Sequence, residues 1–403
     1  MSNSTMNAGG LSPASRLATV PLSGIRKVFD RVRELETEGK DVIHWQIGRP
    51  DFDTPAHIKR AAADALQRGE VHYAPNLGIP ALRKAIGDRT TMDTGIPVEG
   101  MKQASVMSGA NEGIMVSMMA FIQPGDEVLV SDPNWHHYKT CVTLAGGTPI
   151  EVPTREEDGF VMVPEVVESL ITPRTKMLCI TSPGNPTGCV QSRESLAALA
   201  KLAIKYNLLV MSDEIYARIY HGSGVIAPSI YSVPGMAERT IIINGFSKTY
   251  AMDGWRLGWT VASEELTKSI LKVRQYTTVC VNTFIQYGAV AGLNGDQKCV
   301  DDMVGEFSKR RKVMLEGLRA IPGITIVEPE GAFYLFPNIK SFGKTSAEVA
   351  DYLLNEHHIA VVAGSVFGAA GEGYLRLAYS CSLEECQRGI ARLGKALGQL
   401  GKM

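Results

Sequence analysis

GFSKTYAMDGWRLGW, at residues 245–259, is the stretch that decides how the rest of this 403-residue chain is interpreted. It places Lys248 among small residues and Arg256 eight positions later. A lysine in such a setting predicts imine chemistry, because its primary amine can condense with an aldehyde and be displaced by a second amine. Burial and nearby cations ease the loss of its proton by lowering its pKa. Gly245 and Ser247 leave room for a bulky ligand, and the planar donor fork of Arg256 suits a phosphate group.

The composition is that of an ordinary globular protein, long enough for two domains. A formal charge of −1 gives no electrostatic reason to expect nucleic acid or a membrane surface as a partner. No apolar run approaches the roughly 20 residues that a membrane span requires, and the polar residues 1–20 indicate a flexible arm rather than a signal peptide. The seven cysteines form no CxxC pair, which predicts reduced thiols in a cytoplasmic protein and no metal site.

From about residue 56 to residue 281, helical and strand-like segments alternate. Segments 56–69 and 110–123 are expected to be helices. Four short apolar runs are typical of buried strands: EVLVSD at 127–132, KMLCITS at 176–182, LLVMSDE at 208–214 and TIIINGF at 240–246. Such runs, separated by helices, predict an α/β fold in which helices cover both faces of a mostly parallel sheet and make three layers. The loops that follow the strands then meet at one edge, where ligands bind.

The pattern changes after about residue 292 and indicates a smaller α+β domain. The expected elements are a charged helix at 300–320, a strand in AFYLFP at 332–337, a helix at 345–357, a strand at 359–362, a strand in YLRLAY at 374–379 and a terminal helix. The predicted division is an arm at 1–20, a large domain at 48–292, and a small domain made of 21–47 with 293–403.

Several strand ends of the large domain carry polar residues that converge if the sheet is parallel. MSGA at 107–110 opens a helix, whose free N–H groups form a phosphate site; a plain helix cap is the alternative. Asp213 ends a buried strand and can pair with a protonated pyridine nitrogen, or cap a helix. Asn185, in an irregular loop, and Tyr216 can reach a phenolic oxygen on the same ring, although an ordinary turn and a packing tyrosine would look the same.

Together these residues resemble the fold-type I pyridoxal-phosphate-dependent aminotransferases of class I/II, and within them the bacterial aspartate and aromatic aminotransferases. The resemblance covers about residues 21–393. Residues 245–258 match the lysine signature of the family throughout. The supporting motifs are IGRPDFDTP at 47–55, YAPNLGIPALRKAI at 73–86, SPGNPTG at 182–188, SDEIY at 212–216 and GEGYLRLAY at 371–379.

The resemblance implies a set of residues that bind pyridoxal 5′-phosphate. Lys248 corresponds to the Schiff-base lysine, which also moves the proton between the substrate Cα and the cofactor, and Asp213 to the partner of the ring nitrogen. The remaining cofactor positions are Asn185 and Tyr216 at the ring oxygen, Trp135 stacked on the ring, and Ser108, Gly109, Ala110, Ser247 and Arg256 around the phosphate. Tyr73 corresponds to a residue that reaches the phosphate of the neighbouring subunit, which implies a homodimer with shared sites.

The resemblance also implies a substrate site. In YLRLAY the alternation of a strand puts Arg376 on the face opposite Leu375 and Leu377. An arginine in such an apolar strand is costly unless it meets an anion, and the family pattern makes it the fork that binds the substrate α-carboxylate, together with Asn185. A structural ion pair is the alternative. Gly48 corresponds to a backbone position close to the substrate.

Three positions depart from the family pattern. Ala110 stands where some members have a hydroxyl or a lysine, and Gly245 stands where others have a phosphate-binding serine, so that Ser247 is expected to serve instead. Arg49 replaces the commoner acidic or amide residue; it either selects substrates with an acidic side chain or is a solvated surface residue, and the second interpretation is preferred. The adjacent histidine pairs 136–137 and 357–358 suggest no metal cage.

The sequence therefore predicts an aminotransferase that works by a ping-pong mechanism on an L-amino acid and a 2-oxo acid. A lyase, a decarboxylase or an amino-acid oxidase of the same fold shares these motifs and stays open as an alternative. A regulatory domain is disfavoured because no basic DNA-binding segment is present, and a dehydrogenase because no GxGxxG follows the first strand. The lack of a further securely placed cation favours neutral, apolar or aromatic substrate side chains over that of aspartate.

Overall fold

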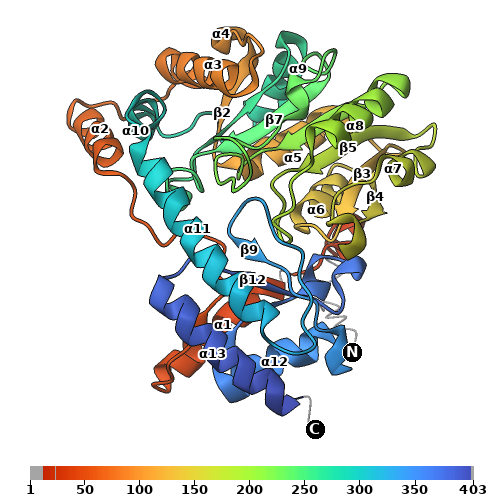
Figure 1. Ribbon diagram of the computed structural model, residues 1–403. Coiled ribbons are helices and arrows are strands. Elements are labelled where there is room, and N and C mark those ends of the chain that lie inside the picture. Colours follow the sequence, from red (N-terminus) through yellow and green to blue (C-terminus); the bar gives the residue numbers. More distant parts are fainter. Residues whose placement is uncertain (1–11, 23, 401–403) are drawn as a thin grey trace.

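A computed structural model describes residues 12–22 and 24–400. Its centre is a seven-stranded sheet, in which β8 runs antiparallel to its neighbours β2 and β7 and the other pairs are parallel (Figure 1). In spatial order the strands are β2 (Ala104–Met107), β8 (Gly258–Val261), β7 (Thr240–Gly245), β6 (Leu209–Asp213), β5 (Thr175–Thr181), β3 (Glu127–Asp132) and β4 (Thr148–Pro153). The mostly parallel sheet that the sequence predicts is confirmed.

Helices cover both faces of this sheet, because alternate residues of its central strands point to opposite sides and both sets are apolar. In β3, Val128 and Val130 pack with α5 and α6 on one face, while Leu129 packs with α8 on the other. The covering helices are α2 (Ala56–Gln67), α3 (Pro80–Thr94), α5 (Ala110–Phe121), α6 (His137–Leu144), α7 (Pro164–Ser169), α8 (Arg193–Lys205), α9 (Glu264–Arg274) and α10 (Thr283–Asn294). The fold is therefore the predicted three-layer α/β arrangement.

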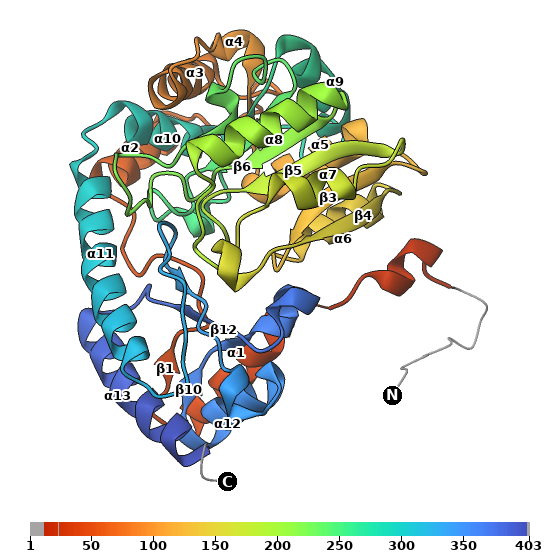
Figure 2. The same ribbon diagram turned by 45° about the vertical axis from the view of Figure 1, so that its right-hand side comes forward.

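A smaller α+β part lies below the large sheet in Figures 1 and 2. It has a three-stranded antiparallel sheet, in the order β11-β12-β9, and a parallel pair of β1 with β10. Its elements are α1 (Gly24–Thr37), β1 (Ile43–His44), α11 (Lys298–Arg319), β9 (Tyr334–Leu335), α12 (Ser346–His357), β10 (Ile359–Ala360), β11 (Val362–Ala363), β12 (Leu375–Ala378) and α13 (Leu383–Leu400). A core cluster in which Trp45, Phe307 and Tyr379 are fully buried holds most of these elements together, and α1 packs on Leu354 and Ala360 through Val32 and Leu35.

The small sheet differs in detail from the sequence-based expectation. AFYLFP forms a strand only at Tyr334–Leu335, and the strand expected at 359–362 is divided between β10 and β11. The division has a simple cause: β10 pairs with β1 and β11 pairs with β12, so the chain passes from one sheet to the other at Val361. The proposed domain limits stay a prediction, and residues 1–11 of the proposed arm lie outside the described residues.

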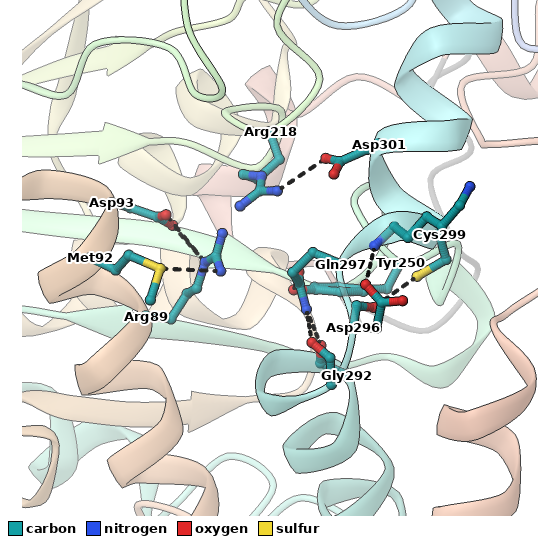
Figure 3. A network of polar contacts seen from close by, with 12 residues as sticks. Arg89, Met92, Asp93, Arg218, Tyr250, Gly292, Asp296, Gln297, Cys299 and Asp301 are labelled. Carbon is teal, nitrogen blue, oxygen red and sulfur yellow. Dashed lines mark hydrogen bonds and ion pairs between the residues drawn. The ribbon is translucent and has the colours of Figure 1, made fainter.

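Two segments connect the large sheet to the smaller part. One is the loop between β1 and α2, and the other is the start of α11, which follows α10 and runs down one side of the molecule (Figures 1 and 2). The second connection is tied to the loop after β7: Tyr250 donates a hydrogen bond to the Gln297 side chain (2.9 Å), which in turn donates to the carbonyls of Gly292 and Gly295. Figure 3 shows this network, with the ion pair of Arg218 and Asp301 beside it.

None of the helices among the described residues combines the length and the apolar character that a membrane crossing requires.

Candidate active site

A cavity of about 280 Å³ lies between the large sheet and the smaller part. The large sheet supplies side chains from the carboxyl ends of its parallel strands, such as Thr181 at the end of β5 and Asp213 at the end of β6. This is the edge at which parallel sheets bind ligands. The predicted site residues that line the cavity are Gly48, Ala110, Trp135, Asn185, Asp213, Tyr216, Ser247, Lys248, Arg256 and Arg376.

Lys248 lies in the loop after β7, and its side chain points into the cavity. Its Nζ donates a hydrogen bond to the carbonyl of Gly48, at 2.7 Å. Burial lowers the pKa of this amine to about 8, and the positive charges of Arg376 and Arg256 act in the same direction, against Asp253 and Asp213. With this pKa, roughly a tenth of the amine is neutral at pH 7 and about half at pH 8, and the neutral form is the one that a nucleophile or a base requires.

Asp213 is 2% exposed and is held on both carboxylate oxygens. Its Oδ2 accepts a hydrogen bond from the hydroxyl of Tyr138, and its Oδ1 accepts one from the backbone N–H of Ile215 at 3.0 Å. Burial raises the pKa of Asp213 to about 6, whereas the hydrogen bond from Tyr138 opposes the rise. The fold thus holds a carboxylate in the interior at the cost of its solvation, which a cation in the cavity would offset.

Arg376, on β12, is 2% exposed and lies over the rings of Tyr334 and Phe367, at 4.8 and 5.1 Å. Its Nη2 donates to the carbonyl of Gln46 (2.7 Å) and its Nη1 to the side-chain oxygen of Asn185 (3.3 Å). Its Nε is buried without a hydrogen-bond partner, and within residues 12–22 and 24–400 no carboxylate pairs with this guanidinium. A buried cation with a free donor is suited to bind an anionic ligand rather than to close an ion pair.

Arg256 lines the same cavity and lies against the start of α5. A Cβ atom on Gly109 would come within 2.5 Å of the Arg256 Nη2, so a side chain at this position would displace the guanidinium. Gly109 also has φ 77°, and Arg256 itself has φ 53° with its Nη1 bonded to the Asp253 carbonyl at 2.7 Å. The first N–H groups of α5 have no partner within the helix. A guanidinium beside a helix N-terminus is suited to bind phosphate.

The side walls of the cavity are aromatic. Trp135 stacks on His137, with ring centroids 4.5 Å apart, and lines the cavity. The hydroxyl of Tyr216 forms a hydrogen bond with that of Tyr334 at 2.7 Å. A flat ligand with an oxygen substituent would find both a stacking surface and hydroxyl partners here.

Three predicted residues do not line the cavity. Ser108 donates its backbone N–H to the Glu112 side chain at 2.6 Å, and Gly109 contributes through its contact with Arg256. Tyr73 is 87% exposed and lines a separate surface hollow with residues 280–284. Arg49 is exposed and is also not among the lining residues.

Eight lining residues were not predicted from the sequence as site residues: Phe29, Gln46, Asn111, Tyr138, Thr181, Ile215, Asp253 and Tyr334. Tyr138 follows Trp135 by three positions, and a helical turn between them brings both side chains to one face, so this spacing could have identified it. Phe29 comes from α1, which is distant in sequence from every recognised motif, and no local pattern marks it as part of the site.

Among the described residues, no group of three or more histidine, cysteine, aspartate or glutamate side chains is placed to hold a metal ion.

With this geometry established, comparison with known proteins gives the family. Residues 40–393 match the family model described as Aminotransferase class I and II. The chain is 42% identical to an aspartate aminotransferase of Pyrococcus abyssi, over 96% of this chain and 98% of the relative, and 40% identical to an aromatic-amino-acid aminotransferase of Thermococcus litoralis, over 95% and 98%. The solved structure of an aspartate aminotransferase from Thermus thermophilus with maleate superimposes with a TM-score of 0.91 at 35% identity, over 96% of this chain and all of that one.

The chain belongs to the class I and II aminotransferases. It is an enzyme that transfers amino groups, and the sequence-based identification of family, fold and reaction is confirmed. The alternatives of a lyase, a decarboxylase or an oxidase are not supported by these relatives.

Proposed function

We propose that the cavity binds pyridoxal 5′-phosphate and that the enzyme moves the α-amino group of an L-amino acid to a 2-oxo acid by a ping-pong mechanism. The observation that carries the proposal is the convergence of Lys248, Asp213 and Arg256 on one cavity. The first suits the aldehyde of the cofactor, the second its ring nitrogen and the third its phosphate. When bound, this cofactor supplies an aldehyde and an electron-accepting ring. The residues present fit this cofactor. Arg256, close to Gly109 at a helix start, suits its phosphate, and the buried carboxylate of Asp213 suits its protonated ring nitrogen.

Each residue has a proposed role in holding the cofactor. Lys248 would hold the aldehyde, and Asp213 would keep the ring nitrogen protonated through its negative charge. The other contacts would come from Asn185 and Tyr216 at the ring oxygen, Trp135 on the ring face, and Ser108, Gly109, Ala110, Ser247 and Arg256 around the phosphate. The chemistry then depends on which bond at the substrate Cα is held perpendicular to the ring.

Arg376 would fix the α-carboxylate of the amino acid, helped by Asn185, with Gly48 close by. This would place the Cα–H bond in front of Lys248. The amine of Lys248 would take the proton from Cα and deliver it to the carbon of the cofactor aldehyde group. A pKa of about 8 suits both directions of this transfer, because the amine is then neither a very weak nor a very strong base at neutral pH.

Lys248→Ala provides the test. Turnover should fall by about 10³-fold or more, as is usual when a covalent and acid–base group is lost. In the wild type, borohydride reduction followed by peptide mapping should place the cofactor on the peptide that contains Lys248, and this label should be absent from the variant. Normal turnover of Lys248→Ala, or a label on another peptide, would reject the proposed role.

The substrate side chain is proposed to be neutral, apolar or aromatic. Of the described residues that line the cavity, the cationic ones are Lys248, Arg256 and Arg376, and each already has a proposed partner. A side-chain carboxylate would therefore lack a cation within this chain. Single-turnover reaction of the cofactor-loaded enzyme with phenylalanine should be faster than with aspartate; the reverse order would show that a further cation, such as Arg49, enters the site.

A homodimer is proposed on the basis of Tyr73. Its ring is 87% exposed in the single chain, beside the exposed Val71, and it lies outside the cavity of its own chain. Both features agree with a residue that completes the phosphate site of a second copy. Sedimentation equilibrium should give twice the mass of the chain, and a stable, fully active monomer would exclude the shared site.

A further inference from the structure

The backbone of the loop between β1 and α2 contacts two residues of the proposed site, Arg376 and Lys248. The carbonyl of Gln46 accepts a hydrogen bond from Arg376 at 2.7 Å. Two residues later, the carbonyl of Gly48 accepts one from Lys248 at 2.7 Å. The position of this short segment therefore fixes where two charged groups of the site lie.

The end of this loop is fixed to the lysine loop. Thr54 donates to the carbonyl of Ala251 at 2.6 Å and accepts a hydrogen bond from the indole N–H of Trp255 at 3.1 Å. The middle of the loop, residues 49–53, has a weaker contact with the large part: Asp53 pairs with Lys59 of α2 at 2.5 Å, and both side chains are exposed to solvent. Asp51 is also exposed, and its contact lies on the other side of the loop, in the smaller part.

Arg310, on α11, provides that contact. Its Nη1 lies 2.6 Å from Asp51 Oδ1, and its guanidinium lies over the rings of Phe52 and Phe307, at 5.1 and 5.5 Å. The two rings meet edge to face at 5.5 Å. The Arg310 side chain thus binds two successive loop residues, Asp51 by an ion pair and Phe52 by a cation–π contact.

Burying the Arg310 guanidinium costs solvation free energy, which an exposed ion pair would not. It is 6% exposed, and its Nε is buried without a hydrogen-bond partner. The helix that carries it is held at its start by Gln297 and Tyr250 and by the pair of Asp301 with Arg218, as Figure 3 shows. A fixed helix and a buried arginine make a rigid support for the loop.

We propose that Arg310 is a positioning residue, which acts through Asp51 and Phe52 to hold the Gly48 carbonyl against Lys248 and the Gln46 carbonyl against Arg376. The proposal rests on the proposed function, because it takes Lys248 as the reacting amine and Arg376 as the carboxylate fork. This positioning role accounts for Asp51 and Phe52 in the motif IGRPDFDTP, which have no part in the proposed cofactor and substrate contacts.

The test uses three variants and one control. Arg310→Met keeps much of the volume but removes the charge, Arg310→Lys keeps the charge but not the planar fork, and Asp51→Asn removes the ion pair from its exposed side without emptying the core. Arg319→Met is the control, since it removes an arginine of the same helix that pairs with Glu328 at 2.9 Å, away from the cavity.

The first readout does not need the cofactor. In cofactor-free protein, the rate at which an amine-reactive reagent labels Lys248 is followed against pH by peptide mass spectrometry. The charged groups around this amine are Asp213, Asp253, Arg256 and Arg376, and none of them is altered. Loss of the Gly48 acceptor disfavours the ammonium form, so the labelling midpoint should move about 0.5–1 pH unit lower in Arg310→Met and Asp51→Asn, and not in Arg319→Met.

The second readout is steady-state kinetics with saturating cofactor. Arg310→Met should lower kcat/KM for the amino acid by about 10-fold or more through both kcat and KM, because both anchored groups move, and Arg310→Lys should recover part of the loss. A lower melting temperature with unchanged labelling midpoint and unchanged kinetics would overturn the proposal and leave Arg310 a purely structural residue. Turnover that survives in Lys248→Ala would instead reject the proposed function, so the two failures are distinct.

Discussion

Arg376 and Arg256 line one cavity, the first at its proposed carboxylate end and the second at its proposed phosphate end, and their surroundings differ. Arg376 is 2% exposed, lies over two aromatic rings, and contacts Asn185 of the large sheet and the Gln46 carbonyl of the smaller part. Arg256 is exposed, and its Nη1 is held by the carbonyl of Asp253, three residues away in the same loop.

The difference shows how the two ligand groups would be recognised. The Arg376 end is assembled from segments far apart in the sequence, so its geometry depends on the whole fold and is set before a ligand arrives. The Arg256 end is a local structure of one loop and one helix start, and we expect its exposed guanidinium to become ordered when an anion binds. Substitution at the two ends should therefore affect different steps of the reaction.

The largest effect is expected for Arg376→Ala. Two charge-assisted hydrogen bonds to the substrate carboxylate are lost, each contributing about 1.5–3 kcal/mol, so kcat/KM for the amino acid should fall by about 10³-fold. Cofactor affinity, measured by fluorescence titration, should change little. Arg376→Lys keeps the charge and should fall between the two. A variant with normal kcat/KM and weakened cofactor binding would reverse the proposed assignment of the two ends.

Arg256→Ala should have the complementary and smaller effect. The side chain is exposed, so the fold should tolerate its loss, and the dissociation constant of the cofactor should rise by about 10- to 100-fold. With saturating cofactor, the KM for the amino acid should stay close to that of the wild type. Arg388→Ala is the matched control and should change neither quantity. It removes an exposed arginine of α13 that pairs with Asp41. An unchanged cofactor affinity in Arg256→Ala would exclude a phosphate role.

The same contrast explains what the sequence could predict. Arg256, Ser247 and Lys248 share one continuous motif, and short apolar runs mark the strands whose ends carry Asp213 and Asn185, so local pattern and family resemblance were sufficient to bring them together. The large sheet was predictable for the same reason, since its central strands are buried on both faces and read as apolar runs.

The parts that the sequence did not reveal depend on contacts between distant segments. Tyr334 meets Tyr216 across 118 positions, and Gln46 meets Arg376 across 330. Phe29 reaches the cavity because α1 packs on α12 and β10, and the division of the strand at 359–362 arises because two neighbouring sheets each take one half. No local spacing encodes such pairings, because they are decided by how the elements pack.

Tyr138→Phe is expected to have the smallest effect, and it tests Asp213, which lines the same cavity as the two arginines. The change removes the hydroxyl that donates to Asp213 and leaves the ring in place. Asp213 has a pKa of about 6 in the folded protein, raised by burial from an unfolded value near 4, and the loss of a donor to the charged form should raise it by up to about 1 unit more.

The sign of the pH effect follows from this shift. A carboxyl group with a raised folded pKa stabilises the protein at low pH, and this contribution is lost as the pH rises through the folded pKa. In cofactor-free Tyr138→Phe the loss should extend to higher pH than in the wild type. Cofactor binding needs the ionised form, so its acid limb, near pH 6 in the wild type, should also move upward by up to about 1 unit. Tyr206→Phe removes a surface hydroxyl that donates to Glu168 at 2.8 Å and should shift neither curve. Since Tyr138 contacts Asp213, the proposed partner of the cofactor ring, an altered KM for the amino acid with an unchanged acid limb would show that this pair serves the substrate and not the ring.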